Sequence, residues 1–182
     1  MPVRVNKKPA GPKPRTGPVR SLLMVIFDVV DSGNFDDAVA EHEQELVLCE
    51  ALDDQLGMAV AHRRIGECCG ELGSFDDALR HQRLHLDLAQ RCGSVVEQQR
   101  AHATIGLTHF RRAEACGGGT PEEAEALSDA EEAFRQSLQM CEKLRSTTSD
   151  VEYSEMKTRL LMNFGLSYTA FTSLCSVISV TL

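Results

Sequence analysis

Tryptophan is absent from these 182 residues, and aromatic side chains make up only 5% of the chain. This scarcity argues against an all-β sandwich, whose core depends on aromatic and β-branched residues. The seven cysteines include no CxxC pair and no regular framework, which excludes a disulfide-stapled scaffold and favours a reducing compartment. The length suits one ordinary domain. We therefore expect a core made of many small contacts between helices.

Basic residues are missing from the stretch between Ser21 and His62, which holds ten acidic residues. Six of the 19 Lys and Arg lie in residues 1–20, whereas all 27 Asp and Glu follow them, so residues 21–182 carry a formal charge of −14. Such an acidic body repels nucleic acid and attracts basic partners. We predict protein partners and no direct contact with nucleic acid.

Five of the six prolines lie in residues 1–20 together with six basic residues, so this arm is expected to be disordered. The basic residues from Lys7 to Arg15 suit either a solvated tail or a nuclear import signal. The apolar run Leu22–Val30 follows. Because Asp28 interrupts it and no small-residue cleavage site closes it, we do not expect a secretory signal.

A unit of 40 residues is duplicated in the middle of the chain. GNFDDA at 33–38 recurs as GSFDDA at 73–78, and AHRRIG at 61–66 recurs as AHATIG at 101–106. Such a period is typical of helical repeats. The second helix of each unit is expected to begin at the paired acids, which suit a helix N-terminus. Its apolar or small positions fit a 3.6-residue period and recur in three copies: Ala38, Val39, Leu46, Cys49; Ala78, Leu79, Leu86, Ala89; Ala133, Phe134, Cys141, Leu144.

The first helix of each unit carries a glycine in its middle, at Gly66, Gly106 and Gly165. A glycine there costs about 1 kcal/mol relative to alanine, so its recurrence indicates that a neighbouring helix passes too close for a β-carbon. The other shared positions are Ala61, Ile65, Cys69; Ala101, Ile105, His109; and Leu160, Phe164, Tyr168. This is the packing of a helical-hairpin solenoid.

These residues resemble tetratricopeptide repeats in a 40-residue form. The strings AVAHRRIGE, ALRHQRLHLDLA, RAHATIGLTHF and EMKTRLLMNFGLSY are similar to the N-terminal repeat region of the Tonsoku-like family, in which an insertion also falls near the segment 115–128. The resemblance implies an all-α tetratricopeptide-repeat solenoid of about three and a half units over residues 21–171. The expected units are 21–55, 56–94, 95–146 and an incomplete 150–171, followed by a non-repeat tail over 172–182.

The end of the chain, after Arg159, has no charged side chain for 23 residues. Eight Ser, Thr and Asn residues interrupt this stretch, so a membrane anchor is disfavoured. We expect a truncated form or fragment whose last unit lacks its second helix. Such an uncapped end exposes apolar surface and favours self-association.

No catalytic, metal or cofactor site is predicted. His81 and His85 share one helix face but lack further ligands, and we expect them on the surface or in a groove. Cys68 and Cys69 point about 100° apart, which leaves Cys69 as core filler, and His109 is expected to be packed. GGGTP at 117–121 lacks the lysine of a phosphate loop and is interpreted as a linker before a helix at Pro121.

The resemblance places a peptide-binding groove on the first helices, six and two residues before each glycine. The residues at these positions are Val60, Arg64, Arg100, Thr104, Arg159 and Asn163. Asparagine offers a donor and an acceptor to a peptide backbone, and arginine binds carbonyls or carboxylates. The alternative is that these arginines pair with acids inside the solenoid.

An acidic face is the second candidate site, formed by Asp36, Asp37, Glu41 and Glu45. It is either a solubilising surface or a site for a Lys- and Arg-rich segment. The resemblance implies a nuclear, non-enzymatic scaffold in replication-fork-associated DNA repair by homologous recombination, with histone H3 and a large repair-complex subunit as partners. The alternative is a cytoplasmic adaptor that resembles cell-polarity and spindle-orientation scaffolds.

Overall fold

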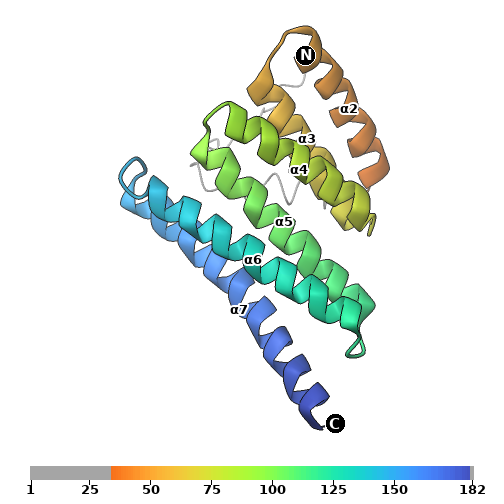
Figure 1. Cartoon of the computed structure of the whole chain (residues 1–182). Coiled ribbons are helices and arrows are strands. Elements are labelled where there is room, and N and C mark those ends of the chain that lie inside the picture. Colours follow the sequence, from red (N-terminus) through yellow and green to blue (C-terminus); the bar gives the residue numbers. More distant parts are fainter. Residues whose placement is uncertain (1–33, 181–182) are drawn as a thin grey trace, which may run out of the picture. The chain divides into compact units, whose positions relative to one another are not determined.

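The computed structural model describes residues 34–180, with side chains described up to residue 165. These residues form six helices and no strand: α2 (Phe35–Ala51), α3 (Gln55–Glu71), α4 (Phe75–Arg91), α5 (Val95–Cys116), α6 (Pro121–Leu144) and α7 (Asp150–Val180) (Figure 1). The predicted all-α class is confirmed. The predictions for the N-terminal arm, for Leu22–Val30 and for the side chains of the C-terminal tail lie outside the described residues.

Three successive turns have the same construction. Each has three residues, and the middle one has a positive φ: Asp53 at 53°, Gly73 at 75° and Gly93 at 66°. Glycine adopts this left-handed conformation without the steric cost of a β-carbon. The following residue then caps the next helix at two of these turns, where Asp54 accepts from Gly57 N–H and Ser94 accepts from Glu97 N–H. The turns therefore repeat with the sequence period.

The helices pack in consecutive pairs. We call α3, α5 and α7 the A helices and α2, α4 and α6 the B helices. Each helix contacts the next along the chain, and α5 also contacts α3 and α7, whereas no B helix of the described chain contacts another B helix. The A helices therefore form a continuous row along one side of the repeats.

The core consists of small clusters between neighbouring helices. Ile65, Cys69 and Ala78 pack together with partly buried Val39 and Leu46, which joins α2, α3 and α4. A second cluster joins α5 to α6 through Ala113, Ala126 and Leu127. A third joins α6 to α7 through Cys141, Tyr153 and Leu160. The expectation of many small contacts, with Cys69 as core filler, is confirmed.

The mid-helix glycines lie where the prediction placed them. A β-carbon on Gly106 would lie 2.7 Å from the ring of Phe134 on α6, and one on Gly66 would lie 2.9 Å from Gln82 Cγ and 3.1 Å from the Ala78 carbonyl oxygen on α4. Gly165 has no such neighbour within 4 Å, since no described helix packs after α7. Close packing therefore explains the first two glycines and not the third.

The segment predicted as an insertion between the helices of the third unit is mostly helical. Only 117–120 lies between α5 and α6, and these two helices have 22 and 24 residues against 17 in α3 and α4. The Ala- and Glu-rich residues on either side favour helix, and Thr120 accepts from Glu123 N–H while Pro121 occupies the first turn. The insertion lengthens a hairpin, and the predicted helix start at Pro121 is confirmed.

Candidate protein-binding face of the A helices

The predicted groove positions recur on each A helix, six and two residues before the glycine. On α3 and α5 all four side chains are half-buried, and on α7 Arg159 is exposed while Asn163 is half-buried. Thr104 donates to the Ala101 carbonyl of its own helix. We call the surface formed by Val60, Arg64, Arg100, Thr104, Arg159 and Asn163 the A-helix face.

The three arginines of this face have different surroundings. Arg64 donates to both carboxylate oxygens of Glu45 on α2, at 3.0 and 3.3 Å. Arg100 donates to Glu97 at 2.5 Å. Arg159 makes no ion pair with any described side chain. The predicted alternative, in which the arginines pair within the solenoid, therefore holds for two of the three.

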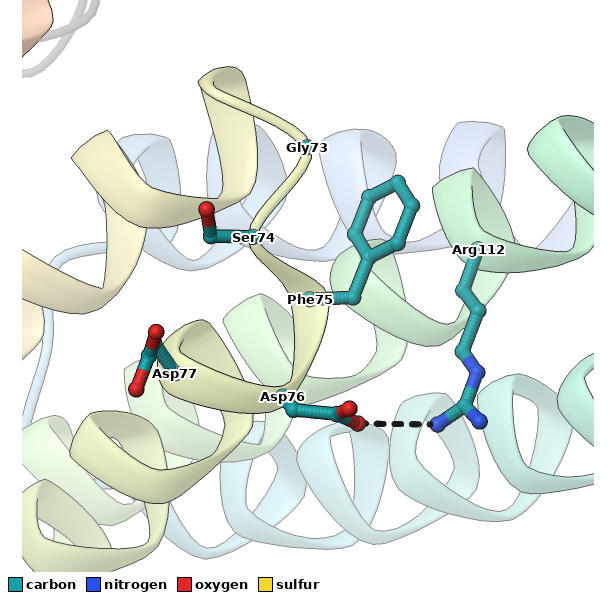
Figure 2. Close-up of a pocket in the computed structure, with 6 residues that line it drawn as sticks. All are labelled: Gly73, Ser74, Phe75, Asp76, Asp77 and Arg112. Carbon is teal, nitrogen blue, oxygen red and sulfur yellow. Dashed lines mark hydrogen bonds and ion pairs between the residues drawn. The ribbon is translucent and has the colours of Figure 1, made fainter.

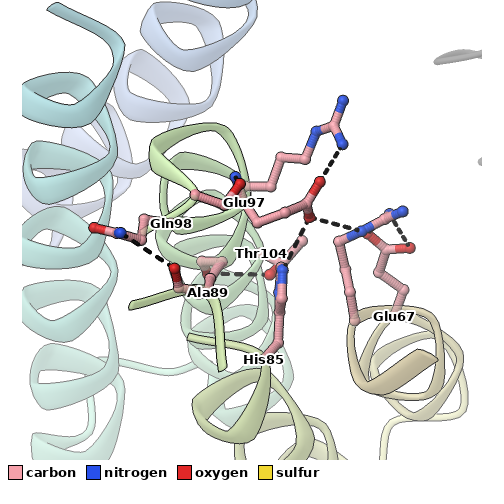
Figure 3. Close-up of polar contacts among 10 residues, drawn as sticks. Glu67, His85, Ala89, Glu97, Gln98 and Thr104 are labelled. Carbon is pink, nitrogen blue, oxygen red and sulfur yellow. Dashed lines mark hydrogen bonds and ion pairs between the residues drawn. The ribbon is translucent and has the colours of Figure 1, made fainter. Parts of the chain in front are cut away.

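Glu97, in the first turn of α5, is the centre of a buried polar network (Figure 3). One carboxylate oxygen binds Arg100, and the other lies 3.0 Å from His85 Nε2 on α4 and 3.8 Å from Arg63 Nε on α3. Arg63 also donates to Glu67, at 2.9 Å. Glu97 therefore joins three helices and holds the Arg100 guanidinium in place.

The electrostatics of Glu97 follow from these partners. Burial by itself would raise the pKa of this carboxyl, which is only 6% exposed. The hydrogen bond with His85 and the charges of Arg100 and Arg63 outweigh burial and lower its pKa to about 2. Glu97 is therefore ionised at neutral pH.

The expectation that His81 and His85 lie on the surface or in a groove is wrong, because both are buried, with exposures of 8% and 0%. His85 contacts Glu97, and His81 Nδ1 lies 3.0 Å from His62 Nδ1 on α3. Desolvation and then the charges of His81, His85 and Arg80 lower the pKa of His62 to about 4. Spacing along one helix could not reveal the partners on α3 and α5.

The acidic face lies on α2, where Asp36, Asp37 and Glu41 are exposed. Glu45 is half-buried and accepts from Arg64 while it also contacts His42 Nδ1 at 3.1 Å. Glu45 thus lies where the acidic face meets the A-helix face, and its charge is already paired. Asp36 and Glu41 of the acidic face form no ion pair with a described side chain.

A hollow at the α3–α4 turn was not predicted. Gly73 to Asp77 line it together with Arg112 of α5, which contacts Asp76 at 3.5 Å (Figure 2). The hollow is open and carries charges of both signs. The repeated GSFDDA motif supplies its other lining residues, but the sequence does not predict Arg112 there, because Arg112 meets Asp76 only through the packing of α5 on α4.

Other candidates of the sequence have structural roles. His109 is packed, as predicted, with 7% exposure. Burial raises the pKa of the Cys68 thiol, and nearby acids raise it further, to about 11. The thiol is therefore protonated at neutral pH. Within the described range, no group of three or more His, Cys, Asp or Glu is placed to hold a metal ion, and no helix is long and apolar enough to cross a membrane.

Several known proteins are similar in sequence to most of this chain. The chain is 44% identical to the mouse Tonsoku-like protein over 147 residues, and 43% identical to the bovine one over 169 residues, which are 79% and 89% of this chain. The chain belongs to the Tonsoku-like family. The Drosophila melanogaster Tonsoku-like protein is 32% identical over 74% of the chain, so the similarity extends beyond vertebrates.

The chain spans about a tenth of the length of the Tonsoku-like relatives it matches, 10% of the mouse and 12% of the bovine protein. No protein-family model matches it. Similarity over this segment, together with the paired helices, assigns the chain as a repeat-domain scaffold of the Tonsoku-like family.

Proposed function

We propose that the chain is a non-enzymatic, nuclear protein-interaction module that contributes to replication-fork-associated DNA repair by homologous recombination. Membership of the Tonsoku-like family supports the biological setting. The observation that carries the binding role is the A-helix face, which presents mostly charged and hydrogen-bonding side chains at two repeated positions of three neighbouring helices. Such a face suits an extended segment of a partner protein. A large repair-complex subunit is one proposed partner.

Histone H3 is the other proposed partner, bound through its Lys- and Arg-rich tail. Asp36 and Glu41 on α2 are exposed, and no described cation pairs with them. Opposite charges steer such a tail toward α2 and raise its association rate, an effect that decays over a Debye length of about 8 Å at physiological salt. We therefore expect H3-tail association to slow as salt rises.

Charge reversal tests this partner. The test variant replaces Asp36, Glu41 and Glu43 on α2 by lysine, and it leaves Glu45 in place because Glu45 pairs with Arg64. The matched control replaces three exposed acids elsewhere, Glu114, Glu122 and Glu125, by lysine. Both variants change the net charge equally, so only a site effect distinguishes them.

Association of a fluorescent H3-tail peptide is measured at low salt by stopped flow, with circular dichroism to confirm the fold. We expect the α2 variant to bind at least tenfold more slowly and the control to bind within about twofold of the parent. An equal loss of association rate in both variants would indicate that the peptide is attracted to the acidic protein in general and not to α2. Unchanged binding by the α2 variant would remove the acidic face from the proposal.

The nuclear setting has its own test. The tagged chain is imaged in cells whose replication forks have been stalled, and it is used for pull-downs from nuclear and cytosolic extracts. We expect the chain at stalled forks and histone H3 in the nuclear eluate. Recovery of cytosolic polarity proteins, with no nuclear signal, would favour the adaptor alternative.

A further inference from the structure

One side of α7 is not covered by any described helix. α7 lies at one end of the row of repeats, where it contacts α6 and α5 (Figure 1). The side that packs on them carries Tyr153 and Leu160, which are buried. The side turned away from them carries Val151, Leu161 and Met162, which are 66%, 48% and 65% exposed. Large apolar side chains that gather on one exposed helix face indicate an interaction surface.

The spacing of this surface suits a second helix. We call it the outer face of α7, formed by Val151, Thr158, Leu161, Met162 and Gly165. Val151, Thr158 and Gly165 follow one another at intervals of seven residues, which keeps them in line toward a helix that packs at a shallow angle. A β-carbon on Gly165 would meet no atom within 4 Å, whereas one on Gly66 or Gly106 would collide with α4 or α6. The outer face therefore leaves room for a helix at the position that α4 and α6 fill in the other repeats.

Two opposite charges lie along one edge of the outer face. Glu155 and Arg159 are one turn apart, both are exposed, and neither forms an ion pair with a described side chain. Arg159 lies where the outer face meets the A-helix face. α7 holds three acids and two basic residues, whereas α2, at the other end of the row, holds six acids and no basic residue. Two copies of this acidic chain therefore repel each other less at α7 than at α2.

We propose that the chain forms a twofold-symmetric dimer in which the outer faces of two α7 helices pack antiparallel, with Thr158 near the twofold axis. Val151 of one copy then lies opposite Gly165 of the other, because both are seven residues from Thr158. Glu155 of each copy lies beside Arg159 of the other, so two reciprocal ion pairs form. A face that is complementary to itself in this way fits a second copy of the chain. The dimer goes beyond the proposed function and does not depend on it.

Charge reversal on the whole chain tests the antiparallel arrangement. The test variants are Glu155→Arg and Arg159→Glu, in each of which like charges face each other across the twofold axis. The matched controls are Glu125→Arg on α6 and Arg83→Glu on α4, where both residues are exposed and form no ion pair with a described side chain. Sedimentation equilibrium over a range of concentrations measures the dissociation constant of the dimer, and circular dichroism confirms the fold.

We expect the parent and both controls to dimerise with similar affinity. Glu155→Arg and Arg159→Glu should each dimerise about tenfold more weakly, because twofold symmetry makes every substitution act twice. An equimolar mixture of these two variants should regain the parent affinity, since a basic edge then meets an acidic one in a mixed dimer. Met162→Lys places a charge in the middle of the outer face and should also weaken the dimer at least tenfold. Because Met162 is exposed, the monomer should remain folded.

Several results would overturn the inference. A parent chain that stays monomeric at every concentration is one, and assemblies larger than a dimer are another, because a twofold contact closes. Dimers that persist unchanged in Met162→Lys and in both charge variants would place the interface elsewhere. A mixture that associates as weakly as its two components would rule out the antiparallel pairing. H3-tail binding through α2 should be the same in all of these variants, so failure of the dimer leaves the proposed function untouched.

Discussion

Arg64 on α3 donates two hydrogen bonds to the carboxylate of Glu45 on α2, at 3.0 and 3.3 Å. The sequence assigned these two residues to different sites, Arg64 to the groove and Glu45 to the acidic face. Because their charges already compensate each other, neither is free to bind a partner without breaking the pair. The pair therefore marks the border between the two surfaces.

A double-mutant cycle measures this pair. Both side chains are about one-third exposed, so solvent screens their attraction. We expect Glu45→Gln and Arg64→Gln each to lower the free energy of unfolding by less than about 1 kcal/mol. In urea titrations, the double variant should lose no more free energy of unfolding than the less stable of the two single variants. A coupling above about 2 kcal/mol would mean that the pair is more shielded from water than its exposure indicates.

The glycines of the A helices should differ in their response to substitution. Gly106→Leu and Gly66→Leu should lower the free energy of unfolding by about 1–3 kcal/mol, because the new side chain collides with Phe134 or with α4. Gly165→Ala is the control, because its β-carbon meets nothing within 4 Å, and it should stabilise α7 by up to about 1 kcal/mol. An unchanged melting midpoint for Gly106→Leu would refute the close-packing explanation.

Glu97 should matter more for stability than a carboxylate of the same network with a single partner. Glu97→Gln leaves Arg63, Arg100 and His85 without the negative charge that they share in a buried site, and we expect a loss of about 2–4 kcal/mol. Glu67→Gln is the control, because Glu67 is 32% exposed and pairs only with Arg63, and it should cost less than about 1 kcal/mol. Equal losses in chemical denaturation would contradict the central role of Glu97.

The buried His62 should make the fold sensitive to acid. Its pKa in the folded chain is about 4, against 6.5 for an ordinary histidine, so below pH 6.5 the unfolded chain takes up a proton that the folded chain does not. Stability is therefore full above pH 6.5 and falls as the pH drops toward 4, by up to about 3 kcal/mol from His62.

Urea unfolding at pH 7.5, 6.0 and 4.5 checks this dependence, and a His62→Gln variant should show a shallower fall. It should not be flat, because burial also lowers the pKa of His81, His102 and His109. Glu97 acts in a separate range: its contribution is full above pH 4.5 and is lost as the pH falls toward 2. Stability that is constant from pH 7.5 to 4.5 would contradict the burial of the histidines.

The features of the fold that the sequence predicted are those that depend on local interactions. The 40-residue period, the helix start at the paired acids, the Pro121 start and the positions of Gly66 and Gly106 all depend on residues close in sequence or on the repeat itself. Helix capping, backbone conformation and the period of the apolar positions act within one or two helices. For that reason the sequence alone predicts them.

The tertiary structure alone decided which polar groups meet. His81 and His85 were expected near solvent, yet their partners, His62 and Glu97, come from the helices on either side. Likewise Arg64 meets Glu45 of α2 and Arg159 meets no acid among the described side chains, although both were assigned to the same groove. The period defines where a side chain sits on its helix, but its partner depends on the residue that a neighbouring helix presents there. The sequence by itself therefore determined the helical repeat. Packing between helices decided which of its charged and polar groups meet a partner.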